Sequence, residues 1–216
     1  MSGGKAPAPL AAVGGLHRRA VFSRRVRVLA EQLARLLPPG PRLLDVGCGD
    51  GSIAMALADR RPDLAIGGFD VFARPNAAIP VTCFDGTRLP VADGVADAVL
   101  LVDVLHHAED AVSLLRECAR AAPVVIVKDH LADSRIQEQV LRFMDWFGNA
   151  PHGVVLPYRY FSTEAWGHAV SAAGLRETRH EPVPGLYPFP FSILFGGKLQ
   201  FIARLERVAE SFEVDQ

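Results

Sequence analysis

Apolar runs of strand length alternate with helix-like patterns between residues 42 and 128, and this alternation constrains the fold more than any other feature. The apolar runs occupy residues 42–46, 64–70, 81–84, 96–102 and 123–128. The helix-like patterns occupy residues 52–59 and 110–121. This order is typical of βαβ units around a mainly parallel sheet. Because the runs are nearly continuous, we expect helices on both faces, that is, a doubly wound α/β fold.

The segments on either side of this core predict one domain over residues 16–216. A helix is expected over residues 17–37, stopped by Pro38, Pro39 and Gly40. The Gly-, Ala- and Pro-rich residues 1–15 are expected to form a disordered tail. Residues 130–161 interrupt the alternation with a helix at 133–147 and a loop. A helix from Ser162 to Gly174 and strands at 175–182 and 199–207 complete a seven-stranded sheet, whose last strand is antiparallel.

The net charge and the cysteine content limit which cellular compartment and which partners are expected. The net charge is −1, and the three cysteines are widely spaced without a CxxC pair. These features predict neither a disulfide framework nor a zinc site. The N-terminus lacks the charged start and apolar run of a signal peptide, and no apolar run is long enough to span a membrane. We therefore expect a cytoplasmic protein that does not bind nucleic acid.

A glycine-rich turn follows the first strand, and it predicts a ligand bound along bare backbone. The strand ends in Asp45, and Gly47, Gly49 and Gly51 follow at every second position before a helix begins. Glycine is needed where the chain turns tightly against a ligand. The spacing differs from the dinucleotide pattern, which has its third glycine at the position of Ser52, and no P-loop lysine follows. A ligand without a pyrophosphate is favoured.

The segment from Leu43 to Ser52 resembles motif I of class I S-adenosylmethionine-dependent methyltransferases, which are Rossmann-like. The resemblance extends to Asp70, Asp85-Gly86 and the strand ending at Asp103. The turn 105–107 is similar to that of small-molecule methyltransferases related to those of quinone biosynthesis. The resemblance implies S-adenosylmethionine as cofactor, with Asp70 on its ribose and Asp85 near its adenine. The implied cofactor-binding residues are Asp45, Gly47, Cys48, Gly49, Gly51, Asp70, Val71, Asp85, Gly86 and Asp103.

Three histidines are candidate general bases for the acceptor. His106 and His107 follow the fourth strand and His130 follows the fifth, at the sheet edge where such folds bind ligands. Imidazole titrates near neutrality and suits proton removal, although a histidine in this turn can equally pack against the cofactor. Lys128 and Asp129 are expected to form an internal ion pair. Asp103 and Asp129 lack a third oxygen ligand at fixed spacing, so no metal is predicted.

The acceptor is expected to be a small apolar or aromatic molecule, methylated most simply on oxygen. Of 17 aromatic residues, 13 lie after residue 140, and residues 130–161 would form a substrate cap. The proposed lid carries Phe143, Trp146, Phe147, Tyr158, Tyr160 and Trp166, with Asp145, Asn149, His152 and Arg159 as its polar groups. An RNA or protein methyltransferase and a non-catalytic S-adenosylmethionine-binding subunit remain alternatives. The sequence leaves the oligomeric state open.

The N-terminal segment is basic and allows two interpretations. Before residue 41 it carries Lys5, Arg18, Arg19, Arg24, Arg25, Arg27 and Arg35 against Glu31. The helix can present a solvated face while it packs over the cofactor cleft. Alternatively it contacts anionic lipid or RNA. Together with the apolar segment 186–195, the lipid alternative predicts a peripheral membrane contact.

Overall fold

A seven-stranded sheet forms the centre of the computed structural model, which describes residues 8–40, 42–149, 158–189 and 191–208. The strand order is β3-β2-β1-β4-β5-β7-β6. The strands are β1 Arg42–Val46, β2 Ala65–Asp70, β3 Val81–Cys83, β4 Ala98–Val102, β5 Val124–His130, β6 Leu175–Pro182 and β7 Gln200–Arg207. Strands β1 to β5 pair in parallel, and β7 runs antiparallel between β5 and β6. The predicted α/β, Rossmann-like sheet with an antiparallel last strand is confirmed.

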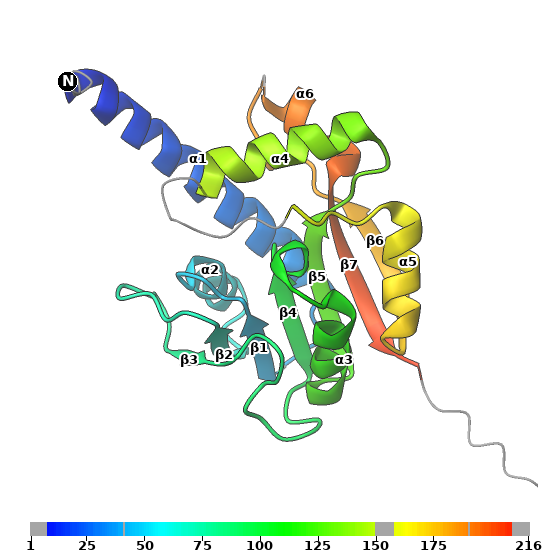
Figure 1. Ribbon diagram of the computed structural model, residues 1–216. Coiled ribbons are helices and arrows are strands. Elements are labelled where there is room, and N and C mark those ends of the chain that lie inside the picture. The colour runs from blue at the N-terminus through cyan, green and yellow to red at the C-terminus, as the bar shows by residue number, and fades with distance from the viewer. Residues whose placement is uncertain (1–7, 41, 150–157, 190, 209–216) are drawn as a thin grey trace, which may run out of the picture.

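Helices cover both faces of the sheet, as the apolar strands predicted (Figure 1). The helices are α1 Ala8–Leu36, α2 Ser52–Arg60, α3 Ala111–Ala121, α4 Arg135–Asn149, α5 Thr163–Ala172 and α6 Phe191–Phe195, with 3-10 turns η1 Leu105–His107 and η3 Gly197–Leu199. On one face α3 and α5 pack on residues such as Val99 and Val125. On the other face α1 and α2 pack on Leu100 and Ile126. Alternate residues of each central strand therefore enter different cores.

Two boundaries and one additional helix depart most from the sequence expectation. Helix α1 begins at Ala8, so it includes residues that were predicted as tail; alanine and leucine favour a helix there, and the two glycines do not stop it. Strand β5 continues to His130, because β7 pairs with it over its whole length, up to His130 opposite Gln200. The apolar connection before β7 contains α6, which sequence periodicity did not predict in so short a segment.

The segment between β5 and α5 leaves the sheet and returns to the same point. Leu131 forms an isolated parallel bridge with Phe161, and the Ala132 amide donates to the Phe161 carbonyl at 2.8 Å. Helix α4 lies across the end of the sheet at which β4 and β5 finish (Figure 1). The Ser162 hydroxyl caps α5 by accepting from the Ala165 amide at 3.1 Å, as predicted. The geometry places α4 over the carboxyl ends of the central strands.

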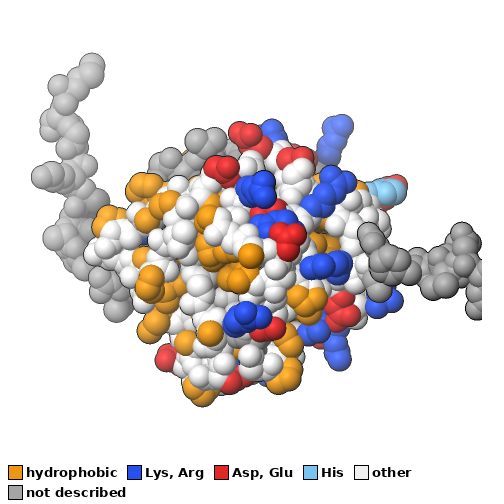
Figure 2. Space-filling model, turned by 90° about the horizontal axis from the view of Figure 1, so that it is seen from below, with side chains coloured by type: hydrophobic (Ala, Val, Ile, Leu, Met, Phe, Trp, Pro, Cys, Tyr) orange, Lys and Arg blue, Asp and Glu red, His pale blue; other side chains and the backbone are white. Residues whose placement is uncertain are grey.

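The surface at the opposite end of the molecule mixes charges of both signs. In the view from below, basic and acidic side chains alternate with small apolar areas (Figure 2). No continuous basic area is visible on that face, in agreement with the net charge of −1. Among the residues that the structure describes, no helix is both long enough and apolar enough to cross a bilayer.

Candidate functional site

The glycine turn lies between β1 and α2 and is fixed by backbone hydrogen bonds. The amides of Gly47 and Cys48 both donate to the Phe69 carbonyl, at 2.7 and 3.0 Å. Gly51 has a φ of +74°, and a Cβ added there would lie 2.7 Å from Cγ1 of Ile79. Only glycine fits a position that is both left-handed and closely packed. The turn therefore presents bare backbone at the start of α2.

Asp70 ends β2 and orders the same turn from the neighbouring strand. One carboxylate oxygen accepts from the Gly49 amide at 2.8 Å and the other from the Phe72 amide at 3.1 Å. A carboxylate has about four lone-pair directions, so both oxygens retain accepting capacity. Asp70 can therefore accept hydrogen bonds from two further donors, such as a vicinal diol.

Asp45 is buried beneath the turn, and its environment makes it sensitive to nearby cations. Its side chain is 2% exposed. Burial, and then the negative charge of Asp70, raises the pKa of Asp45 to about 7. A bound cation would favour its ionised form, because opposite charges attract strongly at low dielectric.

Asp85 follows β3 and is engaged within its own turn. Its Oδ1 accepts from the Thr87 and Arg88 amides, both at 2.8 Å, and these bonds lower the pKa of Asp85 to about 2. Val71 and Phe72 beside it are 64% and 66% exposed. A Cβ at Gly86 would lie 3.2 Å from Cγ1 of Val71, so these two implied cofactor residues are neighbours. The structure thus places an open apolar surface next to Asp70.

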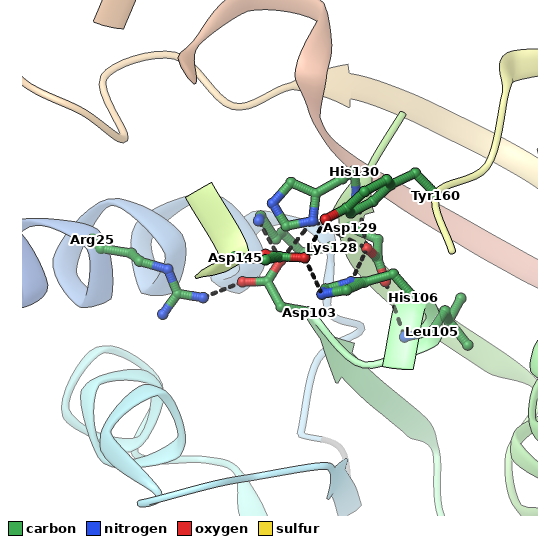
Figure 3. Close-up of polar contacts among 9 residues, drawn as sticks. All are labelled: Arg25, Asp103, Leu105, His106, Lys128, Asp129, His130, Asp145 and Tyr160. Carbon is green, nitrogen blue, oxygen red and sulfur yellow. Dashed lines mark hydrogen bonds and ion pairs between the residues drawn. The ribbon is translucent and has the colours of Figure 1, made fainter. Parts of the chain in front are cut away.

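Asp103 lies immediately after β4 and joins three segments of the chain. Its carboxylate accepts from Lys128 of β5 and from Arg25 of α1 (Figure 3). Burial alone would raise the pKa of Asp103, but the two cations hold it below its usual range. Its φ of +55° is uncommon for a residue with a side chain and is typical of strained functional positions.

Lys128 and Asp129 do not pair with each other, so the expected internal ion pair is wrong. Successive residues of a strand point to opposite faces, which separates their side chains. Lys128 is 1% exposed and pairs with Asp103, whereas Asp129 pairs with His106. This alternation was available from the sequence once both residues were placed in one strand.

His106 lies on η1 between two carboxylates and is the most firmly held of the three histidines. Its Nδ1 is 2.6 Å from Oδ1 of Asp129, and its Nε2 is 3.7 Å from Oδ2 of Asp145 on α4. Burial opposes protonation, but Asp129 and then Asp103 and Asp145 outweigh it and raise the pKa of His106 to about 9. At neutral pH this imidazole is a cation. It is 2% exposed.

His107 and His130 have the opposite protonation preference. Burial, followed by the positive charge of His106, lowers the pKa of His107. Burial, followed by Lys128, lowers the pKa of His130, whose Nδ1 lies 3.3 Å from Asp129. Nδ1 of His107 is buried and has no hydrogen-bond partner among the described residues. Both rings are neutral near pH 7 and have proton-accepting nitrogens.

His106, Asp129 and His130 also satisfy the simplest geometric test for a metal site. One ligand atom from each lies within 4.8 Å of the others. The carboxylate of Asp129, however, already accepts from the Leu105 amide at 3.0 Å, the His130 amide at 2.8 Å and the His106 ring. These hydrogen bonds account for the clustering, so a metal is not needed to explain it.

The aromatic residues expected to form one lid separate into three environments. Tyr160 faces the site: its hydroxyl donates to Asp145 at 2.5 Å, and its ring stacks on His106 with centroids 5.9 Å apart (Figure 3). Trp166 is instead 3% exposed and packs on Phe201 in the core. Phe143 and Trp146 lie on the exposed surface of α4.

The remaining lid residues contribute less to the site. Tyr158 lies under the guanidinium of Arg142, 4.7 Å from its carbon. Arg159 donates to the Glu109 carbonyl at 2.9 Å, and among the described residues no hydrogen bond joins it to the three histidines. The expected positions of Phe147, Asn149 and His152 lie outside the residues whose side chains are described. Arg25 is the site residue that sequence reasoning missed, since it was counted only among the surface charges of its helix.

Comparison with known proteins identifies a family. A family model described as a methyltransferase domain matches residues 17–180. The 27-O-demethylrifamycin SV methyltransferase of Amycolatopsis mediterranei is 29% identical over 107 residues, 43% of this chain and 39% of that protein. The malonyl-[acyl-carrier protein] O-methyltransferase of Geobacter sulfurreducens is 38% identical over 93 residues, 38% of this chain and 34% of that protein. The matches thus cover well under half of these relatives.

Solved structures share the fold. A chain from the complex that contains the Haloferax volcanii Trm112 methyltransferase activator superposes with a TM-score of 0.66 at 17% identity, covering 94% of this chain and 99% of that chain. An O-methyltransferase of neocarzinostatin biosynthesis, bound to S-adenosyl-L-homocysteine and 1,4-dihydroxy-2-naphthoic acid, superposes with a TM-score of 0.57 at 21% identity. The superposition covers 82% of this chain and 52% of that chain.

Proposed function

We infer the function from one premise: this chain belongs to the methyltransferase domain family, whose model matches residues 17–180. We propose that it is an S-adenosylmethionine-dependent methyltransferase that acts on a small, apolar or aromatic molecule, most simply on an oxygen. Its structural neighbour from neocarzinostatin biosynthesis is an O-methyltransferase with a naphthoic acid acceptor. The rifamycin and malonyl relatives are likewise methyltransferases of defined acceptors.

The observation that carries the proposal is the joint geometry of the glycine turn and Asp70. The turn offers backbone without side chains at Gly47 and Gly51, where a Cβ would meet neighbouring residues. Asp70 is anchored by two amides and can accept from both hydroxyls of a ribose. The exposed Val71 and Phe72 supply apolar surface for a purine. These groups fit a nucleoside with an amino-acid side chain and no phosphate.

S-adenosylmethionine supplies an electrophilic methyl group, so the protein has to position the acceptor and manage its proton. Asp45, beneath the turn, provides a carboxyl group whose ionisation a bound cation would promote. Asp103, held by Arg25 and Lys128, marks the boundary between the cofactor side and the histidines. The acceptor would then lie among η1, the end of β5 and Tyr160.

His130 and His107 are the proposed general bases, and His106 is proposed to position them. A general base has to be unprotonated before it takes the proton of a hydroxyl, and a lowered pKa keeps both of these rings neutral. His106 carries its own proton at neutral pH, and its ring lies 4.0 Å from that of His107 and 5.0 Å from that of His130. This assignment refines the expectation that any of the three could act.

Two further expectations belong with this proposal. The three cysteines are unpaired, which is consistent with a reducing compartment such as the cytoplasm. The insertion 130–161 is proposed as the acceptor cap, because its ends meet at Leu131 and Phe161 while α4 brings Asp145 to the histidines. A methyltransferase of RNA would instead be expected to carry a continuous basic surface for its substrate.

Calorimetry with S-adenosylmethionine and S-adenosylhomocysteine tests the proposal. The protein should bind both, and Asp70→Ala should weaken binding by about tenfold or more, since it removes the acceptor of two hydrogen bonds. Asp93→Ala is the control, because that carboxylate is 80% exposed and pairs with Arg120 on the surface. Absence of binding by the unaltered protein would overturn the proposal. Binding without transfer to any phenol or carboxylic acid would favour a non-catalytic subunit.

A further inference from the structure

An exposed apolar surface lies on the outer side of α4 and on the segment that contains α6. We call it the apolar edge and define it by Ile136, Phe143, Trp146, Phe189, Phe191, Ile193 and Leu194. These are seven of the twelve exposed large apolar side chains in the described part of the chain. Their exposed fractions range from 41% for Phe191 to 80% for Phe189. Such a concentration marks an interaction surface.

The two parts of the apolar edge meet where the two helices touch. The ring of Phe143 on α4 stacks with that of Phe195 on α6, with centroids 6.4 Å apart. Ile136, Val140 and Phe143 line a shallow groove together with Leu194 and Phe195. Arg135 borders this groove.

The sequence of α4 explains why this surface faces outward. Ile136, Val140 and Phe143 recur at four- and three-residue steps and form one stripe. Leu141 and Asp145 form a second stripe, four residues apart, and both are buried. The helix thus uses one side to cover the histidines and has a second apolar side that a single core does not require.

The shape and charge of the apolar edge fit a bilayer. Phe189 and Ile193 are 80% and 73% exposed, so they protrude rather than form a pocket, and a fluid bilayer accommodates such protrusions. Residues 182–205 contain no Asp or Glu. Arg24 donates to the Gly185 carbonyl at 2.9 Å, which places a basic residue of α1 next to the start of this segment.

We propose that the apolar edge inserts into the interfacial region of an anionic membrane, with Arg24 and Arg135 near the headgroups. In Figure 1, α4 and α6 lie at the same end of the molecule, and the contact of Arg24 with Gly185 joins α1 to the segment before α6. This orientation would turn the outer side of α4 to the lipid while Asp145, on its inner side, stays at the candidate site. Binding to the membrane does not depend on methyl transfer.

Vesicle flotation without any methyl donor tests this proposal, so its result is independent of the proposed function. The full chain should float with vesicles that contain phosphatidylglycerol and bind much less to pure phosphatidylcholine. The variant Phe189→Ser, Ile193→Ser, Leu194→Ser should lose about tenfold or more of its partitioning, because three inserted side chains become polar. Met55→Ser with Val208→Ser is the control for polar substitution of exposed apolar residues outside the apolar edge.

Tryptophan quenching by brominated lipid locates the contact. The chain has two tryptophans, Trp146 with 55% exposure and Trp166 with 3%. Brominated lipid should quench the fluorescence of the unaltered chain. The quenching should disappear in the variant Trp146→Phe, and this variant should still float with the vesicles. The proposal is overturned if the full chain fails to float at low salt or if the triple variant floats equally well. It is also overturned if the unaltered chain is a dimer and the triple variant is a monomer that floats as well as the unaltered chain does.

Discussion

Replacing His106 by Gln should remove a pH-dependent part of the stability of this protein. In the folded chain the imidazole lies between Asp129 and Asp145, and its pKa is raised from 6.5 to about 9. This difference corresponds to about 3 kcal/mol of additional stabilisation of the imidazolium by the fold. The figure is an upper bound, because burial and relaxation reduce what a single substitution removes.

The direction follows from the raised pKa. Below pH 6.5 the histidine is protonated in both the folded and the unfolded chain, and the full contribution is present. As the pH rises from 6.5 to 9, the unfolded chain has lost the proton while the folded chain still holds it, so the contribution falls. The native protein should lose up to about 3 kcal/mol of its free energy of unfolding over this window through His106.

Urea unfolding of both proteins between pH 6 and 9.5 measures this effect. Other groups also titrate: burial raises the pKa of Asp45 to about 7, and it raises the pKa of Cys48 to about 12. Both proteins share these groups, so the difference between their curves reports His106 together with the neighbours whose pKa its charge shifts, such as His107 and His130. The destabilisation by His106→Gln should be greatest at pH 6 and should shrink towards pH 9.5. Parallel curves would refute the assigned protonation state.

Three further substitutions test other parts of the structure. Gly51→Ala should lower the free energy of unfolding in urea by at least about 1 kcal/mol more than Gly40→Ala does. Both glycines have positive φ, but only Gly51 lacks space for a Cβ. Equal losses would contradict the packing described for Gly51. Lys128→Met should lower the free energy of unfolding by about 3–5 kcal/mol, because it leaves the charge of Asp103 poorly compensated. Adding Asp103→Asn should restore part of this free energy, and no restoration would show that the loss comes from packing. Affinity for S-adenosylmethionine should rise from pH 6 to 8 in calorimetry, since a cation favours ionised Asp45, and Asp45→Asn should flatten this profile.

The sheet could be predicted because its signal is local and repeated. Each central strand is an apolar run that ends before a turn, and the parallel order follows from the helices between them. Helix α6 could not be predicted in the same way. Its five residues are too few for a helical period, and prolines at 188 and 190 obscure it further. Its position depends on contacts with α4, which lies about fifty residues earlier in the sequence.

The site was predictable only in part, for a related reason. Asp70, Asp103 and the histidines end strands or follow them directly, so the topology alone brings them to one edge of the sheet. Arg25 lies 78 residues before its partner Asp103, in a helix whose arginines all look alike in the sequence. Only the packing of α1 on the sheet distinguishes it. The reach of Asp145 to His106 likewise depends on how α4 crosses the strand ends.

The charges of the buried cluster explain how so many ionisable groups can be placed together. The carboxylates of Asp103, Asp129 and Asp145 are balanced by Arg25, Lys128 and protonated His106 (Figure 3). A neutral total is what burial requires, because an uncompensated charge is expensive at low dielectric.

The same balance distinguishes the histidines. A second proton on His130 would add a positive charge beside Lys128, which already lowers its pKa. A proton taken from an acceptor would therefore be held weakly and passed on, which is the property that a base needs if it is to act again.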